Sequence, residues 1–260
     1  LYLNHGGIYE IPGLIFSYFP MNLDLLYMIP LYFGNDILPK YIHFAFALLS
    51  AWLIFGYLKK RTNALYATTG AVLFLSIPVI VKLSITVYVD LGLVFFSTAT
   101  LIYFFKWIEA SGKLKYLIVS AIWCGLALGT KYNGLILLFL FTMFIPFVYS
   151  QIRSAERAAR PRGIFTGITK AEVRGVVTAV VFMLIALIIF SPWLIRYYIW
   201  TGNPVYPLYD NLLQDDAEEP RGHTQAPLET GMEQPPNDGR PKGIANPFLM
   251  RKFIYQEKIW

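Results

Sequence analysis

Six long apolar stretches, separated by short polar segments, dominate the hydropathy pattern of the chain. A helix needs about 20 apolar residues to cross a bilayer, and each stretch approaches that length. We expect membrane spans at residues 37–58, 64–85, 88–107, 114–130, 133–150 and 173–195. Pro78 stands inside the second stretch, where a proline removes a helix hydrogen bond and predicts a kink or a break. The pattern predicts an all-α, polytopic transmembrane helical bundle with six spans.

The remaining segments differ from the spans in composition. Residues 1–36 are rich in aromatic residues, glycine and proline, and within them residues 23–33 predict one amphipathic helix at the membrane surface. Residues 214–247 are polar and rich in proline, which predicts disorder. We therefore expect a partial first loop with interfacial helices at 1–36, a transmembrane bundle at 37–195 and a second loop at 196–260.

Composition supports a membrane protein and excludes several other classes. Hydrophobic residues make up 56% of the chain and charged residues only 15%, unlike an ordinary soluble domain. The net charge of +6 does not indicate nucleic-acid binding, because the basic residues lie between the spans. Cys124 is the only cysteine and lies within a span, which excludes a disulfide framework. The chain begins with Leu1 and shows no signal peptide, and we expect it to be a fragment of a longer protein.

The distribution of basic residues predicts which side of the membrane each segment faces. One side carries three basic residues at 59–61, three at 106–115 and six at 153–174. The other side has only four up to the last span, each at a span boundary: Lys40, Lys82, Lys131 and Arg196. The positive-inside rule places the more basic side in the cytoplasm. Residues 1–36, Asp90, Lys131 and everything after residue 195 are then expected to face outward.

Three charged residues on the outward face are candidates for chemistry. Asp90 begins an apolar run, where a carboxylate is costly unless it has a partner or a function; the alternative is that it complements the helix dipole. Lys131 and Arg196 each close a span, where the alternative is snorkelling to the headgroups. Cations kept near a carboxylate at this depth suggest an anionic ligand such as phosphate.

Other features have a simpler structural interpretation. His43, within the first span, is interpreted as a core histidine bonded to a neighbouring helix, and His5 has no second ligand at metal-binding spacing. Glu10 and Asp24 are either acceptor-binding carboxylates or merely exposed acids. The run Gly125-Leu-Ala-Leu-Gly129 is a small-xxx-small face, for which we expect close helix packing rather than ligand binding.

Several motifs on the outward face resemble a known enzyme family. They are Leu1-Tyr-Leu-Asn-His-Gly-Gly-Ile8, Tyr18-Phe-Pro20, Leu26-Tyr27, Tyr88-Val-Asp90, Gly125-Leu-Ala-Leu-Gly-Thr-Lys-Tyr-Asn-Gly134, Pro192-Trp-Leu-Ile-Arg196 and Thr201-Gly-Asn-Pro-Val-Tyr-Pro207. Because these motifs occur in this order along the chain, the chain is similar to polyprenyl-phosphate-dependent glycosyltransferases of the GT-C superfamily. These include dolichyl-phosphate-mannose protein mannosyltransferases and the lipid A aminoarabinose transferase. The resemblance covers most of residues 1–210 and implies a GT-C-like bundle.

The resemblance also implies a reaction and a location. It implies transfer of a sugar, with inversion, from a polyprenyl-phosphate-linked donor to an acceptor lipid, glycan or protein on the extracytoplasmic face of a prokaryotic inner membrane. The family's catalytic base is an Asp that would lie upstream of Leu1, and its second outward acid falls on Asp90. Where the aminoarabinose transferase has Glu-Lys before its loop prolines, this chain departs with Tyr18-Phe19-Pro20.

On this basis we assign roles to individual residues. Lys131 and Arg196 stabilise the departing lipid phosphate as negative charge develops. Asp90 orients one of these cations, positions the acceptor or helps hold a divalent metal, the only cofactor considered. The predicted substrate-binding residues are Tyr132, Asn203, Tyr88 and Asp24. Expected partners are the lipid-linked donor, the acceptor and membrane lipids, without nucleic acid.

Two other functions are compatible with charges at membrane depth. A transporter or flippase of a lipid-linked or anionic substrate commonly shows an internal repeat and broken helices near the midplane. Here the charges cluster at one interface and no repeat is evident, which favours the enzyme. A polymerase or ligase of surface polysaccharide shares the lipid-linked substrate but uses larger outer loops.

Overall fold

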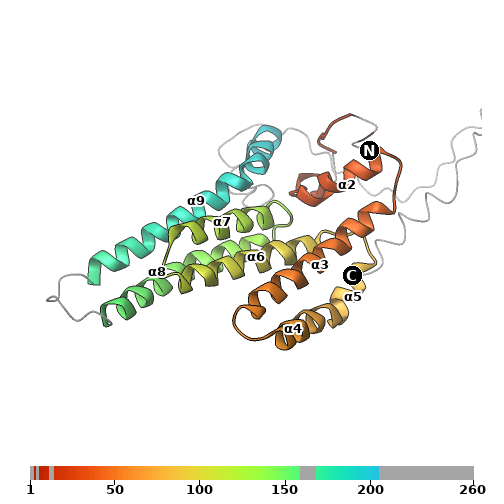
Figure 1. Ribbon diagram of the computed structural model, residues 1–260. Helices are drawn as coiled ribbons and strands as arrows, with labels where there is room; N and C mark the ends of the chain where they lie inside the picture. The colour runs from red at the N-terminus through yellow and green to blue at the C-terminus, as the bar shows by residue number, and fades with distance from the viewer. Residues whose placement is uncertain (1–2, 4–5, 12–14, 159–167, 205–260) are drawn as a thin grey trace, which may run out of the picture. The chain divides into compact units, whose positions relative to one another are not determined.

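The computed structural model describes residue 3 and residues 6–11, 15–158 and 168–204. Every regular element within these residues is a helix (Figure 1). The elements are η1 (Ile15–Tyr18), α2 (Asn22–Tyr32), α3 (Leu38–Lys59), α4 (Ala64–Ser76), α5 (Pro78–Ser84), α6 (Asp90–Glu109), α7 (Leu114–Leu128), α8 (Gly134–Ala158) and α9 (Ile168–Thr201). The predicted all-α fold is confirmed. Residues 205–260, which contain most of the predicted second loop and its disordered part at 214–247, lie outside the described residues.

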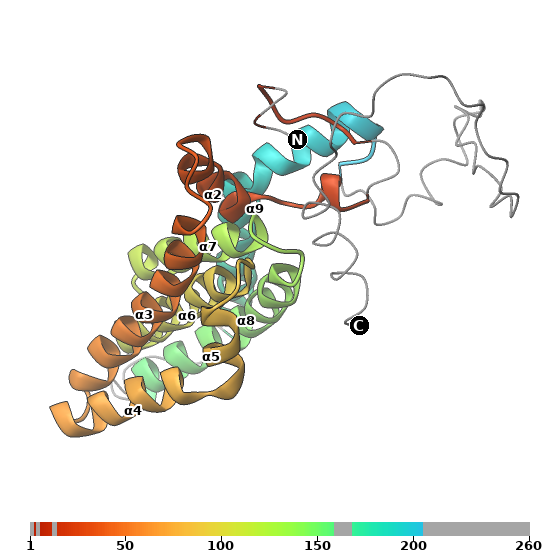
Figure 2. The ribbon, with the colours of Figure 1, turned by 90° about the vertical axis from the view of Figure 1, so that its right-hand side faces the viewer.

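The long helices pack as neighbouring pairs. α6 packs on α7, α8 packs on α9, and α7 joins the two pairs because it also packs on α9. α3 packs on α4 and on α6. Figures 1 and 2 show these long helices running alongside one another, with α2 at the end where α6 begins and α7 ends. This arrangement is the helical bundle that the apolar stretches predict.

Helix length shows how the bundle relates to a membrane. Four described helical segments are long and apolar enough to cross one: Leu38–Lys59, Asp90–Glu109, Gly134–Ser154 and Glu172–Thr201. α4 and α5 are bent by 66° and together make a fifth candidate, so the break predicted at Pro78 is confirmed. α7 has only 15 residues, or ~22 Å, which is less than the ~30 Å hydrocarbon core. The chain is thus an integral membrane protein in which length and composition support four or five of the six predicted spans.

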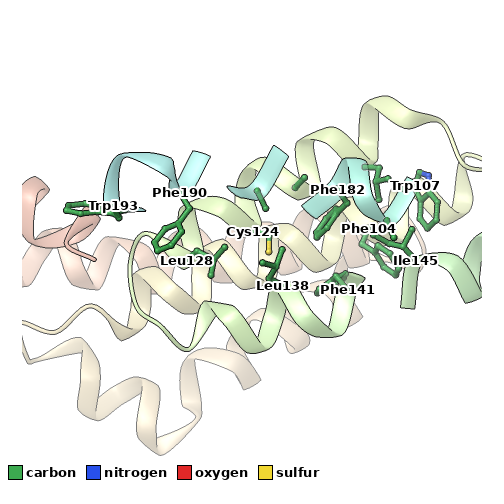
Figure 3. Packing of buried hydrophobic residues seen from close by; sticks show 14 of the residues in the cluster. Phe104, Trp107, Cys124, Leu128, Leu138, Phe141, Ile145, Phe182, Phe190 and Trp193 are labelled. Carbon is green, nitrogen blue, oxygen red and sulfur yellow. The ribbon is translucent and has the colours of Figure 1, made fainter. Parts of the chain in front are cut away.

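The main hydrophobic core lies between α6, α7, α8 and α9. Figure 3 shows aromatic side chains of α6, α8 and α9 packed around the smaller residues of α7. Trp107, Cys124 and Phe182 are completely buried there, and Phe104 meets Phe141 edge to face with ring centroids 4.8 Å apart. The free thiol of Cys124 is therefore a core group. These contacts fix α7 even though it is too short to span a membrane alone.

Two glycines let α7 approach its neighbours closely. A Cβ atom on Gly125 would come within 2.6 Å of the backbone oxygen of Ala186 in α9. A Cβ atom on Gly129 would come within 2.1 Å of Nδ2 of Asn22, at the start of α2. Real Cβ atoms do not approach other atoms this closely, so a side chain at position 125 would collide with the backbone of α9, and one at position 129 would displace the Asn22 side chain. The tight packing predicted for this small-xxx-small face is confirmed.

The helix α2 fastens the first loop to one end of the bundle. It coincides within one residue of each end with the helix predicted at residues 23–33. Leu23, Tyr27 and Pro30 are its buried residues. The backbone N–H of Asn22 donates to the backbone oxygen of Gly129 across 2.9 Å, which ties the start of α2 to the end of α7. The first loop is thereby held over the bundle end that carries the candidate residues.

Candidate functional site

Asp90 and Lys131 form an ion pair at this end of the bundle. Nζ of Lys131 lies 2.8 Å from Oδ1 of Asp90, and the two side chains are 39% and 31% exposed. Asp90 is the first residue of α6, where its charge also complements the helix dipole. The partner that a carboxylate at membrane depth requires is therefore Lys131. Both groups remain accessible to a ligand.

The end of α7 determines where Lys131 lies. α7 ends at Leu128, with Gly129 as its C-cap. The backbone N–H of Lys131 then donates to Ala127 O across 3.2 Å, and Gly134 N–H donates to Lys131 O across 2.9 Å. The sequence predicted only two residues between these helices, whereas the connection covers residues 129–133. Because its backbone is hydrogen-bonded at both ends, the connection holds Lys131 in place.

Tyr27 fixes the segment that precedes Asp90. Its hydroxyl donates to the backbone oxygen of Tyr88 across 2.8 Å, and its side chain is nearly buried. Burial, and then the negative charges of Asp24 and Asp90, raise the pKa of Tyr27, so its hydroxyl stays a donor at neutral pH. The predicted substrate-binding residues Tyr88 and Asp24 are both exposed beside it. The sequence motifs included Tyr27 but gave no signal of this role.

Arg196, on α9, has a different set of contacts. Its Nη2 donates to the backbone oxygens of Tyr18 (3.0 Å) and Phe19 (2.7 Å) in the first loop. The guanidinium carbon also lies over three rings of its own helix, at 4.4, 5.2 and 4.8 Å from the centroids of Trp193, Tyr197 and Trp200. Arg196 thus joins α9 to the first loop through two backbone carbonyls, while the rings of α9 support its guanidinium group.

Tyr132 links the surroundings of Lys131 to those of Arg196. It follows Lys131 directly, and its ring centroid lies 5.2 Å from that of Phe19 and 6.3 Å from that of Tyr197. Burial raises the pKa of Tyr132, while the positive charge of Arg196 acts in the opposite direction. The structure therefore pairs Asp90 with Lys131 and places Arg196 beyond Tyr132, among its own partners.

The last predicted binding residue, Asn203, lies in a tight turn after α9. It is 3% exposed, so a ligand has little access to it. Its backbone N–H donates to Oγ1 of Thr201 across 3.2 Å, and Gly202 turns the chain with a φ of +73°. Its described contacts belong to this turn.

An apolar cavity of about 610 Å³ opens near Arg196. Its walls come from the first loop and from α2, α3, α6, α7 and α9, and two of its lining residues are polar: Asn22 and Arg196. The lining residues are Ile8, Asn22, Leu23, Leu25, Leu26, Phe46, Phe96, Leu126, Ile189, Pro192, Trp193 and Arg196. Asn22 is bonded within the wall, because its Oδ1 accepts from Nε1 of Trp193 across 2.9 Å. Such a cavity suits an apolar chain.

The described residues do not form a metal-binding cluster. Among them, no three His, Cys, Asp or Glu side chains come close enough to hold an ion. Oδ1 of Asp90 is instead bonded to a cation, the ammonium of Lys131, which would repel a metal ion at that atom. The predicted role of Asp90 in metal binding remains a prediction.

Comparison with known proteins identifies one related family. A family model described as dolichyl-phosphate-mannose-protein mannosyltransferase matches residues 27–161, just over half of the 260-residue chain. The match includes Tyr27, Asp90 and Lys131 and ends before Arg196. No curated protein matches the chain, and no solved structure matches it.

Proposed function

The chain belongs to the dolichyl-phosphate-mannose-protein mannosyltransferase family, and on that premise we propose that it moves a sugar from a polyprenyl-phosphate-linked donor to an acceptor on the extracytoplasmic face. The family and the apolar helices make it a membrane glycosyltransferase. The observation that carries the finer proposal is the Asp90–Lys131 ion pair, within the family-matched stretch and at the end predicted to face outward. A prokaryotic inner membrane is the proposed location.

Lys131 is the proposed stabiliser of the leaving group. The acceptor hydroxyl oxygen bonds to the anomeric carbon with inversion, the bond from that carbon to the phosphate oxygen breaks, and the lipid phosphate leaves with that electron pair. A cation placed near this oxygen stabilises the transition state more than the ground state. An ammonium group has three N–H donors, of which Asp90 takes one. A general base accepts the proton of the acceptor hydroxyl as the new bond forms.

Asp90 is proposed to hold the ammonium group of Lys131 in the orientation that the reaction needs. The 2.8 Å contact with Asp90 restricts the rotamers of the long lysine side chain. Tyr27 and the capped end of α7 hold the backbones on either side of the pair. A lipid phosphate then meets a cation that is already in place, which lowers the reorganisation needed during the reaction.

The apolar cavity supports a lipid-linked donor. With about 610 Å³ of space, apolar walls from five helices, and Asn22 and Arg196 among its lining, it would take part of a prenyl chain close to the first loop. The remainder of the chain would lie in the bilayer. A donor bound in this way would have its phosphate near the bundle end that carries the ion pair.

The proposed outward face can be tested by labelling. A cysteine at Gly7, which is exposed, should react with a membrane-impermeant thiol reagent in intact cells. A cysteine at Ala158, on the basic side, should react only after the membrane is opened. The reverse pattern would place the ion pair in the cytoplasm and contradict an extracytoplasmic reaction.

The proposed reaction can be tested with the full-length protein in proteoliposomes. Labelled polyprenyl-phosphate sugars serve as donors with lipid, glycan and protein acceptors, and the readout is label on the acceptor. Asp90→Asn should lose transfer, whereas Glu109→Gln should keep it. Glu109 forms the other ion pair of the described residues, with Arg61 where α3 and α6 end, so it controls for loss of a surface carboxylate. Movement of the donor across the bilayer without transfer would instead support the flippase.

A further inference from the structure

His43 lies in the second turn of α3 and is completely buried. A buried imidazole is costly unless its ring nitrogens are hydrogen-bonded. Its Nδ1 lies 2.9 Å from the backbone oxygen of Thr86 and 3.1 Å from that of Leu83. Its Nε2 lies 3.1 Å from the backbone nitrogen of Leu91. The interpretation of His43 as a core histidine bonded to neighbouring elements is confirmed, and these elements lead directly to Asp90.

The partners of His43 determine its tautomer. Carbonyl oxygens only accept hydrogen bonds, so Nδ1 must carry a proton and donate to Leu83 or Thr86. A backbone N–H only donates, so Nε2 must offer its lone pair to Leu91. Only the neutral imidazole protonated at Nδ1 satisfies both sides. His43 is thus a donor toward the end of α5 and an acceptor toward the start of α6.

The bond to Leu91 takes the place of an ordinary helix cap. N–H groups in the first turn of a helix have no partner inside the helix, and a Ser, Thr, Asp or Asn at the N-cap position usually accepts one of them. The N-cap residue of α6 is Val89, which makes no such side-chain bond. His43 supplies the acceptor from α3 instead. Because Leu91 directly follows Asp90, the imidazole holds the helical turn that carries the carboxylate.

We propose that His43 is a positioning residue that fixes Asp90 against Lys131 for the transfer reaction. The inference rests on the proposed role of this ion pair. His43 holds the segment 83–91 from α3, and Tyr27 holds it from α2 through the Tyr88 backbone. An aliphatic residue at position 43 would leave the Leu91 N–H and the carbonyls without this partner, and the turn that carries Asp90 would be free to shift.

Two substitutions of His43 test its acceptor role toward Leu91 and its donor role toward the carbonyls of Leu83 and Thr86 separately. A glutamine amide places an oxygen near the position of Nε2, so His43→Gln keeps an acceptor for Leu91. An asparagine amide places an NH₂ group near the position of Nδ1, so His43→Asn keeps the donor and loses the acceptor. We expect kcat of His43→Gln to stay within about threefold of wild type and kcat of His43→Asn to fall roughly tenfold or more, since a shift of about 1 Å can cost about a hundredfold.

These rates are measured per folded molecule, counted by gel filtration in detergent, with the lipid-linked donor varied. The KM for the donor should stay within about twofold in both variants, because the displaced group acts on the breaking bond more than on the bound donor. Equal loss of kcat in the two variants would overturn the proposal. So would wild-type kcat in His43→Asn.

A double-mutant cycle with Asp90→Asn separates positioning from a general loss of packing. If His43 acts through Asp90, adding His43→Asn to Asp90→Asn lowers the residual single-turnover rate no further. If the two losses multiply, His43 supports the fold in general and the proposal is wrong. Wild-type turnover by Asp90→Asn itself would refute the proposed role of Asp90. The cycle therefore distinguishes a failure of this inference from a failure of the proposed function.

Discussion

Lys131 and Arg196 sit at the same end of the bundle but have opposite surroundings. Lys131 has one carboxylate partner, Asp90, and its side chain is 39% exposed. Arg196 donates to the backbone oxygens of Tyr18 and Phe19 and lies over three aromatic rings. Lys131 lies in the connection after α7 and Arg196 lies within α9, and the sequence assigned both cations to the departing phosphate. Their partners now favour different tasks: ligand binding for Lys131 and attachment of the first loop for Arg196.

The typical contributions of such contacts to protein stability support different roles for Lys131 and Arg196. A partly exposed ion pair contributes roughly 0–1 kcal/mol to stability, so the fold depends little on Lys131. Hydrogen bonds to a charged group contribute roughly 1.5–3 kcal/mol each, and a cation over an aromatic face adds about 0.5–2 kcal/mol. Arg196 combines both kinds of contact. Substitutions should therefore separate activity at Lys131 from stability at Arg196.

The largest effect is expected for Lys131→Met. Loss of one preorganised charge partner in the transition state costs on the order of 3 kcal/mol, or a hundredfold or more in turnover. Lys131→Arg should also be impaired, because a planar fork does not replace a compact ammonium at a fitted site. Thermal unfolding should remain close to that of wild type. Near-normal turnover by folded Lys131→Met, measured as sugar transfer at matched expression, would leave Lys131 as a headgroup anchor.

Arg196→Met should show the opposite pattern. Losing the carbonyl bonds and ring contacts should lower the free energy of unfolding by roughly 2–4 kcal/mol. The first loop should become more sensitive to proteolysis, while turnover per folded molecule falls by less than about tenfold. Thermal unfolding in detergent and limited proteolysis measure these effects. A variant as stable as wild type but without turnover would show that Arg196 does bind the phosphate.

The sequence predicted the features that depend on neighbouring residues. The apolar stretches located the helices, Pro78 located the break between α4 and α5, and residues 23–33 located α2. These features follow from hydropathy, from the missing N–H of proline and from helical periodicity. The short length of α7 was missed because its apolar run continues to Thr130, while the helix ends at Leu128.

The site was predictable only in part, because its contacts join distant segments. The pairing of a cation with Asp90 follows from the cost of a charge at membrane depth. His43 and Leu91 are 48 residues apart, and Asn22 and Trp193 are 171 apart. No local pattern marks such contacts. The carbonyl partners of Arg196 were hidden for the same reason, since any residue can supply a backbone oxygen.

Gly129→Ala tests the contact between the end of α7, which precedes Lys131, and the start of α2. Its effect on the free energy of unfolding should be intermediate. The new Cβ would come within 2.1 Å of Nδ2 of Asn22. The Asn22 side chain, which is hydrogen-bonded to Leu126 and Trp193, must then shift, at a cost of roughly 1–3 kcal/mol. Gly56→Ala in α3 is the matched control, because its Cβ would meet no atom within 4 Å. That control should stabilise the helix by about 0.5–1 kcal/mol. Similar unfolding temperatures for the two variants would contradict the close packing of α2 on α7.

The smallest effect on stability is expected for Trp193→Phe, which tests the hydrogen bond between Asn22 in α2 and Trp193 in α9. The substitution removes the 2.9 Å bond from Nε1 to Oδ1 of Asn22 but keeps a ring beneath Arg196. A hydrogen bond of this kind contributes about 1 kcal/mol. Trp123→Phe removes the same atoms from a half-buried indole whose N–H is itself buried and has no partner among the described residues. The difference between the unfolding free energies of the two variants therefore isolates the bond. Trp193→Phe should be the less stable by about 1 kcal/mol, and equal stabilities would show that the bond does not hold α2 to α9.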